Sequence, residues 1–292
     1  MKTLLSHRLS SLAWLAMLAT CLASSAPAQL APDSPLAPLH SIPPVAHTEA
    51  APENELRLGG FLVSGVTTRI QLGTAQGSVG SQINFADMLG GDTSVSVFRA
   101  DARWGISGPH SLEASWYDLD LHGHRTLTAN LTFGGKDYML GTTVDSRYRT
   151  NVYKLVYGYA FYRDARHEVT GLVGAHIMQV QTSISATSLG QFENFSATAP
   201  LPSFGVAWKA RWTDLFSTRL AVQYFGLSLE KGKYSGHFND VFAAAEYRLS
   251  RNGGVGVGYN RFDLGGMFKS GPLSLRANYA YNGLLAYLFV QF

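Results

Sequence analysis

Apolar and polar side chains alternate residue by residue through much of this chain, and this period of two constrains its fold more than any other feature. The clearest segment is Phe204 to Trp212, FGVAWKARW, with large or apolar residues at the even positions. Successive side chains of a β-strand point to opposite faces, so one face is apolar and the other carries Lys209 and Arg211. Segments 98–104, 151–162 and 168–179 alternate in a similar way.

Composition narrows the class of protein. Only 15% of the residues are charged, against about 25% in ordinary soluble domains, while 12% are aromatic and 30 are glycine. After the first thirty residues there is no run of about 20 apolar residues, which a membrane-spanning helix needs. Either a secreted all-β domain or a membrane β-barrel fits these observations.

The N-terminus indicates export. Lys2 and Arg8 precede a short apolar stretch, residues 12–22, and Ala26-Pro27-Ala28 supplies a small-x-small cleavage site. These features predict a secretory signal peptide over residues 1–28.

The single cysteine, Cys21, lies within the predicted signal peptide, so the exported chain has no thiol. Disulfides, cysteine metal ligands and thiol catalysis are thereby excluded. Lipidation of Cys21 is a minor alternative, because Leu18 to Cys21 loosely resembles a lipobox. Without the signal peptide there are 21 basic and 20 acidic residues, a balance that gives no reason to propose a nucleic-acid partner.

Residues 29–54 contain six of the eleven prolines and no hydrophobic periodicity. They predict an extended, solvated periplasmic leader before a single domain over residues 55–292.

The connections between the alternating segments are themselves alternately short and long along the chain. The short polar turns are at 107–109, 163–166, 213–214 and 251–254. The longer connections are at 73–91, 123–144, 186–201, 231–236 and 265–271. Short turns on one rim and long loops on the other are typical of outer-membrane barrels, with the short turns in the periplasm.

Between these connections we count ten strands. They are expected at 56–72, 92–105, 110–122, 145–162, 167–184, 202–212, 215–229, 237–249, 255–264 and 273–292. The sequence therefore predicts an all-β fold, a transmembrane antiparallel up-and-down β-barrel of about ten strands. Eight or twelve strands stay open, because 123–144 has room for a further hairpin.

The C-terminus strengthens the membrane interpretation. Alternate residues form an apolar face that ends on an aromatic: Leu284, Ala286, Leu288, Val290 and Phe292. This pattern resembles the C-terminal signal by which bacterial outer-membrane proteins are assembled. It implies a Gram-negative outer membrane, with membrane lipid, lipopolysaccharide and the barrel-assembly machinery as partners.

Several segments resemble a poorly characterised group of Gram-negative outer-membrane barrels in the OmpA/OmpW-like superfamily. They are Ile83 to Gly90 (INFADMLG), Ser115 to Asp120 (SWYDLD), Tyr153 to Tyr159 (YKLVYGY) and Gly256 to Asn260 (GVGYN). The resemblance implies a small barrel and supplies no catalytic residue.

The candidate functional residues are ionisable side chains on the inward face of the expected strands. They are Arg99, Asp101, Arg103, Glu113, Lys154, Glu168, His176, Lys209, Arg211, Arg219, Asp240, Glu246 and Arg248. An eight-stranded barrel is filled by its own side chains, and ten strands lie near that limit. We expect an ion-paired network that fills the lumen, consistent with a structural or surface-interaction role. A narrow path for small solutes is the alternative, and the oligomeric state stays open.

Enzymatic activity is a less favoured hypothesis. A membrane-embedded lipid-modifying enzyme needs a Ser or Asp/His constellation near the outer rim. His176 lies mid-strand, and His122 and His124 alternate with Asp118 and Asp120, but no Gly-x-Ser-x-Gly elbow is present. The same alternating group is a weak candidate for a cation site. We expect no cofactor, no metal and no catalysis.

Four tryptophans are expected at the membrane interfaces: Trp104, Trp116, Trp208 and Trp212. Such aromatics usually form girdles at the two membrane surfaces, and sugar stacking is the alternative. Trp208 and Trp212 adjoin a short turn, which suits the periplasmic girdle.

Overall fold

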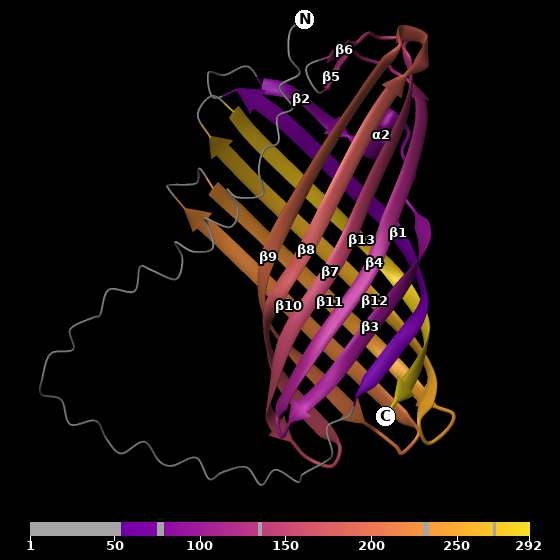
Figure 1. The fold of residues 1–292 in the computed structure, drawn as a ribbon, viewed down its shortest axis with the longest axis vertical. Helices are drawn as coiled ribbons and strands as arrows, with labels where there is room; N and C mark the ends of the chain where they lie inside the picture. Colours follow the sequence, from indigo (N-terminus) through magenta and orange to yellow (C-terminus); the bar gives the residue numbers. More distant parts are fainter. Residues whose placement is uncertain (1–53, 75–78, 134–135, 230–233, 271–272) are drawn as a thin grey trace, which may run out of the picture.

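The computed structural model describes residues 54–74, 79–133, 136–229, 234–270 and 273–292. Ten antiparallel strands follow one another around a closed barrel, in which β13 pairs back onto β1 (Figure 1). The barrel strands are β1 (Glu55–Thr74), β3 (Val95–Ser107), β4 (His110–Thr126), β7 (Thr143–Arg163), β8 (His167–Ala186), β9 (Gln191–Arg211), β10 (Phe216–Leu229), β11 (Tyr234–Arg248), β12 (Gly253–Ser270) and β13 (Leu273–Gln291). The predicted fold class and strand number are confirmed. The predicted signal peptide, 1–28, and the predicted leader up to residue 53 lie outside the described residues.

Short turns join the strands at the end of the barrel where β1 begins and β13 ends. In the turn between β7 and β8, the backbone N–H groups of Arg166 and His167 donate to the Asp164 carboxylate at 2.7 and 2.6 Å. The Tyr162 hydroxyl also donates to it, at 2.6 Å, and these bonds together lower the pKa of Asp164 to about 2. By the rule for outer-membrane barrels, this is the periplasmic end.

Two segments expected to be long loops are strands. β8 runs to Ala186 and β9 starts at Gln191, so the expected loop 186–201 shrinks to the turn η1 (Thr187–Leu189) and Gly190. β12 likewise extends through most of the expected loop 265–271. Most residues between 192 and 198 are exposed on both faces of the strand. The prediction was wrong there because a strand with two exposed faces shows no apolar alternation.

Two of the other three long connections, 73–91 and 123–144, contain small elements. β2 (Val79–Asn84) and helix α2 (Phe85–Leu89) occupy the first, and the hairpin of β5 (Leu131–Phe133) and β6 (Lys136–Tyr138) occupies the second. The backbone N–H of Asp92 donates to the His122 carbonyl of β4 at 2.8 Å. The segment after α2 therefore attaches to β4 beyond the point where β3 stops pairing with it. None of the helices in the described part of the chain is long and apolar enough to cross a membrane.

An apolar belt surrounds the outside of the barrel toward its periplasmic end. On β7 it is formed by alternate exposed residues from Tyr153 to Phe161. This span of nine residues matches the roughly 9–11 that a tilted strand needs to cross the hydrocarbon core. The apolar belt continues through Leu58, Leu62, Phe98, Trp104, Trp116, Ile177, Phe204, Val222, Tyr224, Val257, Tyr259, Leu284, Leu288 and Val290. Such a continuous band of exposed apolar side chains is the lipid-facing surface.

Beyond the apolar belt the strands continue, and there polar side chains face outward. β7 has 21 residues, about 70 Å of strand at roughly 3.3 Å per residue, and the apolar belt takes less than half of it. Its residues Asp145 and Arg147 point outward there, whereas Val144, Tyr148 and Val152 are buried inside. This outer part of the barrel stands in water, and its interior contains buried apolar side chains that continue into the barrel at the level of the apolar belt.

Candidate functional site

The structure places most of the predicted ionisable residues inside the barrel, at the level of the apolar belt. Asp240 is the centre of the first group, which we call the central cluster. It lies 3.1 Å from Lys154 Nζ and 3.2 Å from His176 Nε2, and Asn260 Nδ2 donates to its other oxygen at 2.6 Å. These partners come from β7, β8 and β12, so hydrogen bonds cross the lumen from one wall to another.

Arg99 extends the central cluster to β3. Its guanidinium binds Asp101 at 2.9 Å and donates to Asn260 Oδ1 at 2.9 Å. The same guanidinium lies 5.6 Å from the ring centroid of Phe61 and 5.1 Å from that of Tyr117. Because the cation has both an anionic partner and aromatic faces, its burial is compensated.

A second cluster lies nearer the periplasmic end. Arg103 binds Glu168 at 2.5 Å and lies 3.8 Å from Glu113. Arg219 binds Glu113 at 2.6 Å, and Arg163 binds Glu168 at 2.7 Å. Each carboxylate thus meets two cations, from strands on different sides of the barrel.

A third cluster contains residues that the sequence analysis did not select. Arg57 pairs with Glu55 and, at 3.0 Å, with Glu246. Glu55 also accepts a hydrogen bond from Gln291 Nε2 at 2.9 Å and lies 3.8 Å from Lys209 Nζ. Glu55 and Arg57 alternate with Leu56 and Leu58, so the period of two already indicated their inward direction.

Two further predicted lumen residues lie at the periplasmic mouth. Arg248 donates to Gln291 Oε1 at 2.9 Å, and Arg211 is exposed. Both line a hollow at the periplasmic mouth.

Aromatic rings cover the central cluster on its outer side. Phe238 lies 5.0 Å from the His176 ring and stacks on Phe262 at 5.8 Å, and Phe262 stacks on Tyr281 at 5.4 Å. All three aromatic side chains are at most 2% exposed. The inside of the barrel therefore changes from ionic to aromatic along its axis, with no predicted lumen residue in the aromatic layer.

The residues considered for a cation site or for catalysis lie on the outside of β4: Asp118, Asp120, His122 and His124. Arg149 Nε donates to Asp118 at 3.0 Å, Arg147 Nε donates to Asp120 at 2.7 Å, and His124 Nδ1 lies 2.6 Å from Asp145. The hydrogen bonds from Arg147 lower the pKa of Asp120. The carboxylates are thus occupied by neighbouring strands. Among the described residues, no three His, Asp or Glu side chains are grouped to hold a metal ion.

The wall is interrupted between β9 and β10. The two strands pair from Phe204 with Tyr224 down to Arg211 with Ser217, and Phe204 and Tyr224 both belong to the apolar belt. Beyond Phe204, β9 continues to Gln191 and pairs with β8 alone in the described part of the chain. Figure 1 shows β9 rising to the outer tip of the molecule while β10 ends lower. We call residues 194–203 of β9 the free edge, because there the described strand pairs with β8 and not with β10.

Two prolines account for this interruption. The N–H of Arg211 donates toward the β8 side, to Arg166, and the N–H of Trp212 donates toward the β10 side, to Phe216. By alternation, even-numbered residues of β9 direct their N–H groups away from β8. Pro200 and Pro202 therefore lack the N–H that would bond to β10 and leave the pairing with β8 intact, which is where proline is tolerated in a sheet.

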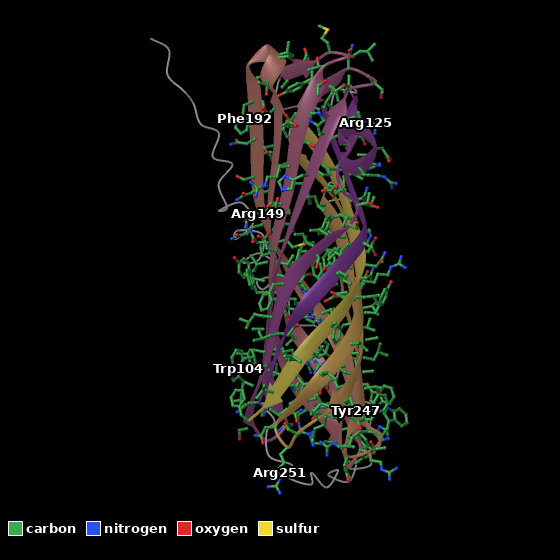
Figure 2. The ribbon with its side chains drawn as sticks, turned by 90° about the vertical axis from the view of Figure 1, so that its right-hand side faces the viewer. Trp104, Arg125, Arg149, Phe192, Tyr247 and Arg251 are labelled. Carbon is green, nitrogen blue, oxygen red and sulfur yellow. The ribbon has the colours of Figure 1, made fainter. Side chains whose placement is uncertain are left out.

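Exposed aromatic side chains lie at the outer end of the free edge and just beyond it. Phe192 is 58% exposed and Phe195 is 38% exposed, and Leu189 in the adjoining turn is 48% exposed. Figure 2 shows Phe192 near the outer tip, far from Trp104 and Tyr247 at the periplasmic end. This apolar surface lies well outside the apolar belt.

The remaining predicted residues lie on the outside of the barrel. Trp104, Trp116 and Trp212 are exposed, and Trp208 stacks on His167 with 6.0 Å between ring centroids. Trp116 is the last outward apolar residue of β4 before Asp118, at the outer edge of the apolar belt. The C-terminal set is exposed along one outward face of β13 and the residue that follows it: Leu284, Ala286, Leu288, Val290 and Phe292.

No family model and no curated protein matches the chain. Among solved structures, the outer membrane protease OmpT of Escherichia coli is similar over 84% of this chain and 98% of that chain, with a TM-score of 0.52 and 12% identity. Ail, the attachment invasion locus protein of Yersinia pestis, aligns with 83% of this chain and 100% of its own at 11% identity and a TM-score of 0.28. The toluene transporter TodX of Pseudomonas putida aligns with 84% of this chain and 91% of its own at 10% identity and a TM-score of 0.31. The likeness to OmpT shows a shared fold, and with the apolar belt it identifies the chain as a ten-stranded Gram-negative outer-membrane β-barrel protein.

Proposed function

We propose that this protein is a barrel with a filled lumen that presents the free edge of β9 to a partner at the cell surface. The ion clusters and the aromatic layer support a filled lumen, because their side chains cross the barrel and are mutually paired. A surface-interaction role then rests on the part of the barrel outside the membrane.

The free edge is the observation that carries this proposal. An edge strand presents unpaired backbone N–H and C=O groups, which an extended peptide can pair with as an added strand. Proteins usually protect such an edge with prolines, charges or a covering segment. Here the prolines protect only the end near the membrane, at Pro200 and Pro202, and the outer residues 194–199 carry no charged side chain. The unprotected part is thus the part farthest from the membrane.

The test is selection of peptides on the protein held in lipid nanodiscs. We expect a random peptide display library to yield extended binders that are lost with Ser196→Pro, which removes a donor from the free edge. Ser196→Ala is the matched control, because it keeps the backbone donor and should keep binding. Binders that tolerate Ser196→Pro, or no binders at all, would refute strand addition at this edge.

The second candidate function is a lipid-modifying enzyme, for which His124 and Asp145 form the one exposed His–Asp pair with a hydrogen bond of 2.6 Å among the described residues. His124 is eight residues beyond Trp116 on β4, which corresponds to about 20 Å above the apolar belt for a strand tilted by about 40°. Ester bonds of membrane lipids lie next to the hydrocarbon core, so the pair is too far out to reach them. Hydrolysis of phospholipid or lipid A that disappears with His124→Ala or His176→Ala would overturn our preference.

A further inference from the structure

The outer wall beyond the apolar belt differs from side to side in how its arginines are paired. On β7, Arg147 pairs with Asp120 of β4, and the next outward arginine is paired in the same way. The wall of β12, β13 and β1 carries three exposed arginines: Arg261, Arg276 and Arg69. None of them has an ion pair or a hydrogen bond to the described part of the chain. The one carboxylate in this part of the three strands, Asp263, lies 3.7 Å from His237. This side of the wall therefore has an excess of positive charge, which suits an anion.

Strand register brings two of these arginines together. Arg69 of β1 lies opposite Asn278 of β13, and two residues farther out Gln71 lies opposite Arg276. Arg69 and Arg276 are therefore diagonal neighbours on one face of the sheet, with Cα atoms roughly 7–8 Å apart. Two like charges so close repel each other unless an anion lies between them. We call these four residues, two with guanidinium and two with amide side chains, the arginine–amide face.

The arginine–amide face is continuous with the lipid-facing surface, because the same strands carry both. Arg276 is eight residues from Leu284 of the apolar belt on β13, or about 20 Å farther out for a strand tilted by about 40°. Arg261 is two residues beyond Tyr259 on β12, or about 5 Å farther out. The unpaired arginines thus extend from the edge of the hydrocarbon well into the headgroup region. A phospholipid has its phosphate only near the hydrocarbon, whereas a glycolipid with several phosphorylated sugars extends over the whole range.

We propose that the arginine–amide face binds a phosphorylated sugar of a glycolipid in the surrounding outer leaflet. The guanidinium groups of Arg69 and Arg276 donate charge-assisted hydrogen bonds to the phosphate. The amides of Asn278 and Gln71 bond to the hydroxyl groups of the sugar that carries it. The acyl chains of the same lipid lie against the apolar belt, so one molecule contacts both surfaces. Free phosphate is the competing occupant.

The test is native mass spectrometry of the exported protein in detergent, titrated with a rough lipopolysaccharide that carries phosphates on its core sugars. We expect the wild type to bind it and Arg69→Gln/Arg276→Gln to bind it at least about tenfold more weakly, since two charge-assisted contacts are lost. Arg147→Gln is the matched control and should bind like the wild type, because Asp120 already pairs with this arginine on the same outer wall. Heat-modifiable migration on a gel first establishes that every variant has a folded barrel.

The chemical specificity is tested on the wild type. The same lipopolysaccharide without its core phosphates should bind the wild type as weakly as the intact form binds the double variant. Equal binding of the intact form by the wild type and the double variant would overturn the proposal. An equal loss in Arg147→Gln would do so too, because net charge alone would then govern binding. Inorganic phosphate at millimolar concentration should leave the lipid bound, and displacement by phosphate, absent with chloride, would make the free anion the preferred occupant and overturn the glycolipid site.

Discussion

The barrel consists of two regions that differ in which side chains face outward. At the level of the apolar belt, Leu288 faces outward while Asp240 and Arg99 are buried inside. Beyond the apolar belt, Arg147 faces outward while Leu121 is buried inside. Strand geometry is continuous between them, as β7 runs through both. The two regions therefore differ in their outward face, which is apolar at belt level and polar beyond it, and in the ion clusters, which lie inside the belt level.

The surroundings explain this inversion. In lipid, apolar side chains are favourable outside, and the narrow interior is left for ionisable groups that are expensive to bury unless each finds a partner. In water, the outside must be polar, and the hydrophobic effect then drives apolar side chains inward. The stability of the belt region therefore depends on paired charges as well as apolar packing, and that of the outer region depends mainly on apolar packing.

The largest expected effect is on the central cluster. Asp240→Asn leaves Lys154 without its carboxylate in the interior, and we expect a loss of about 3–5 kcal/mol in the free energy of unfolding. Asp120→Asn removes an equivalent carboxylate from the outer wall, where an exposed pair contributes about 0–1 kcal/mol. Urea unfolding in detergent measures both. Equal losses would contradict the proposed difference between inside and outside.

A cavity made inside the outer part of the barrel should destabilise that part and leave the belt region folded. Leu121→Ala removes a fully buried side chain, and we expect it to cost about 2–5 kcal/mol locally. The folded gel mobility of the barrel should persist while protease cuts the outer end faster. His122→Ala, the exposed neighbour, should change neither property. Complete unfolding of Leu121→Ala would mean that the regions are one cooperative unit.

A charged side chain introduced on the outer face should reduce the stability of the barrel within the apolar belt and leave it unchanged beyond the belt. Leu288→Arg puts a cation on the outer face at mid-belt, which costs about 2–4 kcal/mol in a membrane barrel. Asn278→Arg makes the same change on the same strand and face beyond the apolar belt, and we expect no measurable loss. Folding yield into lipid vesicles compares the two variants. Similar yields would show that the lipid boundary does not lie between these two positions.

How much was predictable depended on the region. At belt level, alternation placed Arg103, Glu168 and Arg219 inside, and the structure brings them together. Outside the membrane the free edge has no apolar face, so residues 191–201 were expected to be a loop. The specific partners also escaped prediction, because strand tilt and register decide which inward side chains meet across the lumen. For example, Glu246 pairs with Arg57, although the two residues lie far apart in the sequence.

The smallest expected effect concerns titration on the outer wall. Arg147 holds the pKa of Asp120 below its ordinary value, so the pair contributes fully above the unfolded pKa near 4 and is lost as pH falls through the folded pKa. NMR titration of the carboxyl carbon should show the depressed pKa, with a return to the ordinary value in Arg147→Gln. An unchanged pKa in that variant would assign the shift to another cause.

The central claim is that paired charges and stacked aromatics fill the lumen along its length. Single-channel recording of the purified protein in a planar bilayer tests it most directly. The account predicts a silent bilayer, with no steady conductance over a range of voltages. Large, steady openings of the wild-type protein would contradict it and would restore the solute-path hypothesis.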